Sequence, residues 1–160
     1  MSNTPHFLTK EMAEDAIQRG IDWFIQKKRS FDANWELSGC YIEIIVPAQK
    51  GFNLVPEVLH FKSFTSTNGW KYPFDKIARS KSIQLWSGRN NGNGHTPPHL
   101  LFLGETPYYG GVKRDGIIVT CSGFEESEDS EISTKIASEL ITMARVAFVH
   151  SEARNKDFIE

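Results

Sequence analysis

Apolar residues recur at steps of three and four near the beginning and the end of the chain, and this spacing predicts two amphipathic helices. The first helix is expected to run from Thr9, which can cap it, to about Arg29, with Leu8 folding back onto the first turn. The last helix follows an acidic stretch at 125–131, whose charge suits the positive end of a helix dipole. The apolar faces are Met12, Ala13, Ala16, Ile17, Gly20, Ile21 and Phe24 in the first helix, and Ile132, Ile136, Leu140, Met143 and Ala147 in the last.

Short runs rich in β-branched residues predict strands in the middle of the chain. One strand is expected over 40–46, where Pro47 ends it, and the next over 58–64. A further helix is expected to begin near Pro73 and to stop at Gly88, because these residues are typical of helix starts and helix ends. Its apolar side is Phe74, Ile77, Ala78, Leu85 and Trp86.

The stretch 89–98 has a loop composition and is the segment best suited to carry function. Its glycines and prolines allow neither a helix nor a central strand. A short apolar piece at 100–103 is expected to form a strand. The Asp-Gly pair at 115–116 lies between apolar runs at 110–113 and 117–121, which predicts a β-hairpin.

The predicted order α-β-β-α-β-β-β-α indicates an α+β fold in which helices cover an antiparallel sheet. With 160 residues, the chain has the length of one domain, so we expect a single domain over 1–160 with 1–7 as a flexible arm. The net charge of −2 and the absence of any basic run longer than 27–29 argue against nucleic-acid binding.

The remaining composition indicates a protein of the cytoplasm. No apolar run reaches the length of a membrane span, and residues 1–7 lack the apolar segment of a secretory signal. The two cysteines, Cys40 and Cys121, are expected to be buried thiols rather than a disulfide.

Several local strings, taken in order, resemble the GlcG/HbpS ("haem-degrading") family, which includes the C-terminal domain of PduO-type proteins. The resemblance runs from about Leu8 to Ala147, and it implies a small-molecule pocket, haem as a possible cofactor, and a homo-oligomer. The chain departs from the family pattern at Ile77, where the family has a small residue, and at the tyrosine pair 108–109. The strings are Leu8-Thr9, Asp75-Lys76-Ile77-Ala78, Gly104 to Pro107 with Gly110-Gly111 and Asp115-Gly116, and Ser122-Gly123 with Glu128-Asp129.

The candidate acid/base residues are Glu105, Tyr108, Tyr109 and His60. If Glu105 is buried, its pKa rises and it becomes a candidate acid/base; beside two phenols it makes a proton-transfer set. His60 lies on the second predicted strand, where a neutral imidazole can serve as a general base or as an axial haem ligand. Plain surface or strand positions are the alternative for each of these residues.

The candidate ligand-binding residues include a possible clamp for a carboxylate, such as a haem propionate or a small organic acid. Lys76 and Arg79 lie three apart on one side of the predicted helix, and Arg89 follows it. A solvated helix face explains the same residues equally well. Trp86 and Gly110 are further ligand-binding candidates.

His95 and His99 bracket Thr-Pro-Pro and are counted as ligand-binding residues of the loop. The prolines exclude the helix on which two histidines four apart would share a metal, and no third ligand is near in sequence, so we predict no metal site.

Two functions remain open from the sequence. The first is a small-molecule-binding domain of the GlcG/HbpS type, and the second is a cofactor-free isomerase, cyclase or lyase that uses acid/base residues in the same pocket. A structural or regulatory partner subunit is the third alternative. Both leading hypotheses need a concave site beside the segment 89–111.

Overall fold

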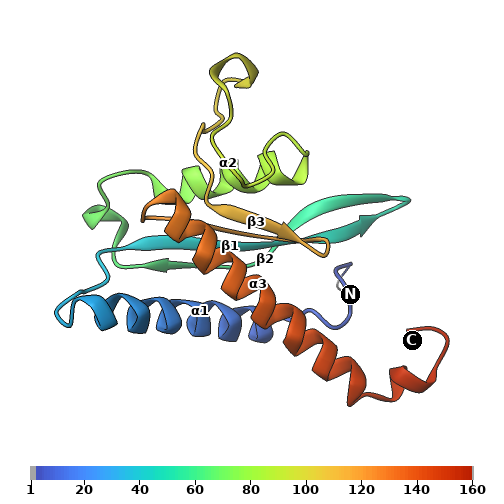
Figure 1. Cartoon of the computed structure of the whole chain (residues 1–160). Coiled ribbons are helices and arrows are strands. Elements are labelled where there is room, and N and C mark those ends of the chain that lie inside the picture. The colour runs from blue at the N-terminus through green and yellow to red at the C-terminus, as the bar shows by residue number, and fades with distance from the viewer. Residues whose placement is uncertain (1–2, 160) are drawn as a thin grey trace.

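The chain forms a four-stranded antiparallel sheet with helices on both faces (Figure 1). The computed structural model describes residues 3–159, and the strand order is β2-β1-β4-β3. The α+β fold with an antiparallel sheet, predicted from the sequence, is therefore confirmed. In chain order the elements are α1 (Lys10–Phe31), β1 (Cys40–Lys50), β2 (Asn53–Phe64), α2 (Phe74–Trp86), β3 (Gly111–Arg114), β4 (Ile117–Ser122) and α3 (Glu126–Val149), with 3-10 turns at Thr67–Gly69, Pro98–Leu100 and Glu152–Asn155.

The central strand β1 is buried on both faces, which accounts for its nearly continuous apolar sequence. Its residues alternate between the two faces of the sheet. Ile42 and Ile44 belong to the main core under α1 and α3, whereas Ile45 packs with Leu85 and Ile118 under α2. Helix α2 thus covers one face of the sheet. The loop over 87–110 that follows α2, which we call the projecting loop, extends on the same side (Figure 1).

Helices α1 and α3 cover the other face, and most residues of their predicted apolar sides are buried in the main core; Met12 and Met143 are only partly buried against it, and Ala147 lies outside it. Thr9 caps α1 as expected, since its side-chain oxygen accepts a hydrogen bond from the Met12 backbone N–H at 3.1 Å. The two helices approach closely at Gly20, where a Cβ atom would clash with the Ile136 side chain. The acidic stretch lies inside the first turns of α3 rather than before it, because Glu125 and Glu128 form a capping box.

The bounds of two predicted strands are corrected by the pairing of the chain. β1 continues through Pro47 to Lys50 and β2 begins already at Asn53. Beyond Ile45, the β1–β2 ribbon has no third strand, and there Pro47 lies opposite Pro56; prolines are tolerated at such an edge. The Asp115-Gly116 hairpin is confirmed.

The predicted strand over 100–103 is wrong. Pro98–Leu100 is a 3-10 turn, and the residues after it form a loop. Within residues 3–159 no strand pairs with this segment, and Phe102 and Leu103 are 69% and 104% exposed. Apolar composition alone did not distinguish an exposed loop from a strand.

The start of the chain contacts the sheet from Asn3 onward. The Asn3 carbonyl accepts a hydrogen bond from the Gln49 N–H at 2.9 Å, and the Phe7 ring meets Phe148 edge to face. Met1 and Ser2 of the predicted arm lie outside the described residues. Between residues 3 and 159, no helix combines the length and the apolar character that crossing a membrane requires.

Candidate functional site

Helix α2 is held against the sheet and against the loop that follows it mainly by polar side chains. The Ser82 hydroxyl hydrogen-bonds the Thr120 hydroxyl at 2.8 Å, and the Gln84 side-chain amide donates to the Thr106 carbonyl at 3.0 Å. Buried polar groups of this kind need partners, and these have them. The buried residues of α2 are Ala78, Lys81, Ser82, Gln84 and Leu85, whereas Phe74, Ile77 and Trp86 of the predicted apolar side are only half-buried.

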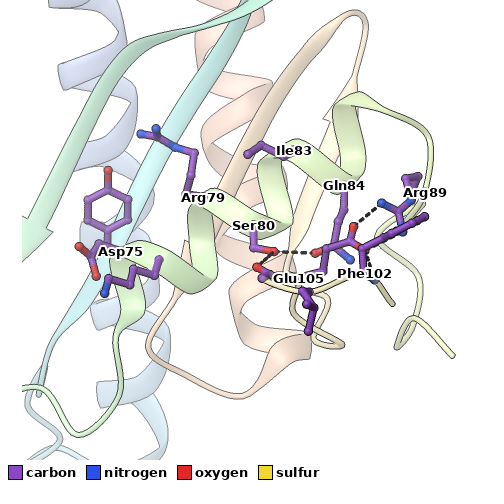
Figure 2. A pocket seen from close by; sticks show the side chains of 12 residues that line it. Asp75, Arg79, Ser80, Ile83, Gln84, Arg89, Phe102 and Glu105 are labelled. Carbon is purple, nitrogen blue, oxygen red and sulfur yellow. Dashed lines mark hydrogen bonds and ion pairs between the residues drawn. The ribbon is translucent and has the colours of Figure 1, made fainter. Parts of the chain in front are cut away.

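A groove of about 590 Å³ follows the outer side of α2, and we call it the α2 groove (Figure 2). Arg79, Ser80 and Ile83 lie along the helix, and Glu105 and Phe102 reach it from the projecting loop (Figure 2). A concave site beside the segment 89–111 is therefore present. Four of the predicted site residues line it together, namely Lys76, Arg79, Arg89 and Glu105.

Two of the three cationic groups expected to bind a carboxylate, Arg79 and Arg89, are already paired with carboxylates of the protein. Arg79 Nε lies 3.0 Å from both carboxylate oxygens of Glu43, whose side chain is 0% exposed. Arg89 lies 2.6 Å from Glu105, and its guanidinium stacks on the Phe102 ring. Internal carboxylates thus compete with a bound acid for both guanidiniums, and of the three cations only Lys76 lacks such a partner within residues 3–159.

Glu105 is a poor acid catalyst in this setting. Partial desolvation opposes its ionisation, but hydrogen bonds from the Phe102 N–H and the Arg89 guanidinium hold its pKa below the usual range. Glu105 is therefore ionised at neutral pH, and the expectation of a raised pKa does not hold for this residue.

A second concavity of about 240 Å³, which we call the Lys81 pocket, lies where the end of β4 meets the starts of α2 and α3. Strand β4 ends at Ser122, and the chain turns at Gly123 into α3, so this corner of the sheet is surrounded by three elements. The pocket is lined by Tyr72, Phe74, Ile77, Lys81, Tyr108, Ser122, Gly123, Phe124, Glu125, Glu126 and Asp129.

A buried ion pair lines the Lys81 pocket. Lys81 Nζ lies 3.2 Å from Asp129 Oδ2, and each side chain is only 3% exposed. The ammonium also donates to the Cys121 carbonyl at 2.9 Å, and Asp129 Oδ1 accepts from the Phe124 N–H at 3.2 Å. Burial raises the pKa of Asp129 to about 7, against the opposing effect of Lys81. This carboxyl can therefore gain or lose a proton near neutral pH.

The hydroxyl of Ser122 has no protein partner. Ser122 is 4% exposed and lines the Lys81 pocket, yet within residues 3–159 its side chain makes no hydrogen bond. A hydroxyl group carries one donor and two acceptor positions, and the Ser122 oxygen is not fully enclosed: in this part of the chain the enclosed side-chain oxygen without a partner is Ser130 Oγ. The free hydroxyl is thus available to a bound molecule.

Gly110, one of the predicted ligand-binding residues, packs behind the ion pair. A Cβ atom at this position would lie 2.6 Å from Lys81 Nζ and 2.7 Å from Asp129 Cβ, and the backbone φ is +132°. Only glycine combines this conformation with this close approach.

The remaining predicted residues fall into two groups. Tyr108 lines the Lys81 pocket, and the His95 ring lies 5.9 Å from Tyr108 and 5.6 Å from Tyr109 between ring centroids. His95 Nε2 also hydrogen-bonds Glu126, which lines the same pocket, at 2.8 Å.

His60, His99 and Trp86 line neither the α2 groove nor the Lys81 pocket. The His60 ring stacks on Phe61 in β2, His99 lies in the 3-10 turn, and Trp86 packs against the small core under α2.

Sequence reasoning missed Lys81, Asp129 and Ser122. A signal was present for the first two. Lys81 lies three residues after Ala78 and four before Leu85, and Asp129 lies three before Ile132, so both charges interrupt apolar helix faces. Nothing in the sequence marks Ser122 as unpartnered.

Haem, which the family resemblance allows, fits neither the α2 groove nor the Lys81 pocket. Haem iron is bound by His, Cys, Met or Tyr side chains. In the α2 groove the only such residue is Tyr41, and burial beside Glu43 raises the pKa of its phenol to about 12. The Lys81 pocket has tyrosines, but its 240 Å³ lies below the ~300 Å³ lower end of pockets for drug-sized ligands.

Across the part of the chain that the structure describes, no three His, Cys, Asp or Glu side chains are grouped to hold a metal ion. Comparisons with known protein families, with curated proteins and with solved structures found no match to this chain.

Proposed function

We propose that this protein is a small-molecule-binding domain of the GlcG/HbpS type that holds its ligand in the Lys81 pocket. The observation that carries the proposal is the buried Lys81–Asp129 pair, which meets an unpartnered Ser122 hydroxyl in a concavity with aromatic walls. A buried ion pair contributes little to stability, so its place in a pocket favours a role in binding. Two strings behind the family resemblance, Ser122-Gly123 and the one that ends at Asp129, lie at this pocket.

A screen of small ring compounds against isotope-labelled protein tests the proposal. Benzamide, benzylamine, benzoate and indole are added separately, and the backbone amide signals of Gly123 and Phe124 are followed by NMR. At least one compound is expected to shift these signals in the wild type and not in Ser122→Val, whose added methyl group narrows the pocket. Ser63→Val, at an exposed strand position, is the matched control.

If none of the four compounds moves the pocket signals, the proposal is wrong. The partner-subunit hypothesis then becomes the leading one.

A cofactor-free acid–base enzyme is the second candidate, and the titration of Asp129 near neutral pH favours it. In an isomerase, cyclase or lyase, Asp129 would move the proton and Lys81 would hold the developing charge. The role first given to Glu105 thus passes to Asp129, which is buried and not fixed in its ionised state by a guanidinium.

Proton exchange tests this second candidate. Acetophenone in D₂O is expected to exchange its methyl hydrogens faster with wild-type protein than with Asp129→Asn, as followed by proton NMR. Equal rates for the two proteins would remove the support for acid–base chemistry at this position.

The homo-oligomer and the cytoplasmic location stay predictions from the resemblance and the composition. Light scattering coupled to size-exclusion chromatography tests the first of them.

A further inference from the structure

The two ends of the Lys81 pocket differ chemically, and this difference limits the chemical class of ligand that the pocket can bind. At the inner end, Lys81 donates two of its three N–H groups to protein acceptors, which leaves one donor. Ser122 adds a hydroxyl donor. The charge of Lys81 is matched by Asp129, so this end offers hydrogen-bond donors without a net positive charge.

The walls of the pocket are aromatic. Phe74 and Tyr72 come from the start of α2 and the turn before it, and Tyr108 and Phe124 come from the projecting loop and the turn between β4 and α3. Flat rings favour stacked or edge-to-face contacts with a second flat ring. The volume of about 240 Å³ suits one substituted ring rather than a fused, multi-ring ligand.

The outer end of the pocket is acidic. Glu125 and Glu126 line it, and Lys81 is the only Lys or Arg among the lining residues. Glu125 caps α3, and Glu126 accepts a hydrogen bond from His95, so the N-terminus of α3 and His95 offset part of their charge. Both side chains nevertheless remain available to a cation at the rim, and an anion there would meet two carboxylates.

We infer that the ligand of the Lys81 pocket is a flat ring compound with an uncharged carbonyl oxygen at one end and a positive charge at the other. The carbonyl oxygen accepts hydrogen bonds from Lys81 and Ser122, the ring lies between the aromatic walls, and the cation lies beside Glu126. This inference rests on the proposed function of the pocket and adds the class of ligand.

Two compounds that differ mainly in the charge of one group test the ligand class. Isothermal titration at pH 7.5 compares 4-(aminomethyl)benzamide, which has a cationic tail, with 4-carbamoylbenzoate, which has an anionic tail. The cationic amide is expected to bind at least about tenfold more tightly, because the rim carboxylates attract one tail and repel the other. Glu126→Gln should narrow this ratio, whereas Glu14→Gln, on the exposed side of α1, should leave it unchanged.

The inner end is tested with Ser122→Ala. Loss of one hydrogen bond should weaken binding of the cationic amide about fivefold, and Ser63→Ala should have no effect. Within residues 3–159 the Ser122 hydroxyl makes no hydrogen bond, so we expect its removal to leave the melting temperature unchanged and the fold intact.

The outcomes separate the ligand class from the pocket. If the anionic compound binds as tightly as the cationic one and Ser122→Ala weakens both, the ligand class is wrong and the pocket stands. If Ser122→Ala changes neither affinity, or if neither compound binds, the inference is overturned. In that case, the NMR screen with simple ring compounds decides separately whether the pocket binds anything.

Discussion

Two carboxylates of this protein show how local surroundings decide the use of the same chemical group. Glu105 accepts hydrogen bonds from the Arg89 guanidinium and from a backbone N–H, and its pKa is lowered. Asp129 is more deeply buried and has a lysine at 3.2 Å, and burial raises its pKa to about 7. The hydrogen-bond donors around Glu105 thus keep it ionised in a structural ion pair. The deeper burial of Asp129 raises its pKa and lets it exchange protons near neutral pH.

The titration of Asp129 is the first prediction at the scale of the residue. A carbon-13 NMR titration of the carboxyl groups should show one aspartate with a midpoint near 7, absent in Asp129→Asn. From the ordinary value of 3.8 up to about 7, the folded chain keeps a proton that the unfolded chain releases. Raising the pH through this window therefore lowers the contribution of Asp129 to the free energy of unfolding. A midpoint below pH 5 would contradict the prediction.

Removing the lysine of the pair should be costly and pH-dependent. Lys81→Met leaves the Asp129 charge buried without a partner, so we expect a loss of about 3 kcal/mol in the free energy of unfolding at pH 8. At pH 5.5 the loss should be smaller, because Asp129 is protonated there. Urea unfolding measures both values, and the exposed Lys76→Met is the control, with an expected change under about 0.5 kcal/mol.

Gly110 should tolerate no side chain. Gly110→Ala places a methyl group against Lys81 and Asp129 at a positive φ, and we expect it to lower the free energy of unfolding by about 2 kcal/mol or more. Gly94→Ala, in the same loop but with no atom within 4 Å of the new methyl group, should be nearly neutral. Thermal unfolding compares the two variants. Equal melting temperatures for Gly110→Ala and Gly94→Ala would show that the loop at Gly110 adjusts without cost, contrary to this prediction.

At the scale of the element, α2 differs from α1 and α3 in how it is held. α1 and α3 bury continuous apolar faces, whereas α2 buries three polar side chains and one small core. Its outer residue Arg79 reaches down to Glu43 in the middle of β1 and neutralises a fully buried carboxylate. Electrostatic pairing therefore holds this helix in register over the sheet.

Loss of Arg79 should consequently destabilise the whole fold. Arg79→Ala leaves Glu43 buried without a counter-charge, and we expect a loss of about 3 kcal/mol in the free energy of unfolding at pH 7. Arg145→Ala, at an exposed position on α3, should change stability by less than about 0.5 kcal/mol. Chemical unfolding of both variants gives the comparison, and similar midpoints would contradict the importance of the Arg79–Glu43 pair.

At the scale of the whole molecule, the two faces of the sheet have different roles. The main core lies under α1 and α3, whereas the α2 groove lies on the outer side of α2 and the Lys81 pocket lies between the starts of α2 and α3. The projecting loop contributes to both sites, with Phe102 and Glu105 in the groove and Tyr108 in the Lys81 pocket. The apolar layer under α1 and α3 thus supports a layer on the α2 side that is more polar and more exposed to solvent.

Hydrogen exchange should reveal this division. Amides of the central strands β1 and β4 are expected to exchange last, and those of 89–105 first, because this loop has few backbone hydrogen bonds and exposed side chains. Mass spectrometry of peptic fragments measures both. Protection of the loop equal to that of β1 would mean that the α2 layer is as rigid as the core.

Much of the scaffold followed from the sequence. The helical faces of α1 and α3, the cap at Thr9 and the Asp115-Gly116 hairpin are local signals, since each depends on residues a few positions apart. Boundaries that depend on a neighbouring strand were less accurate, as the longer β1 and β2 and the loop at 100–103 show.

The sequence by itself determined the class of fold, because apolar periodicity and turn chemistry act over short distances. Only the tertiary structure decided the chemistry, because pairing, burial and pKa depend on atoms that are far apart in the chain. Glu43 meets Arg79 and Lys81 meets Asp129 only after β1, α2 and α3 have packed, and that packing also leaves Ser122 without a partner in the pocket.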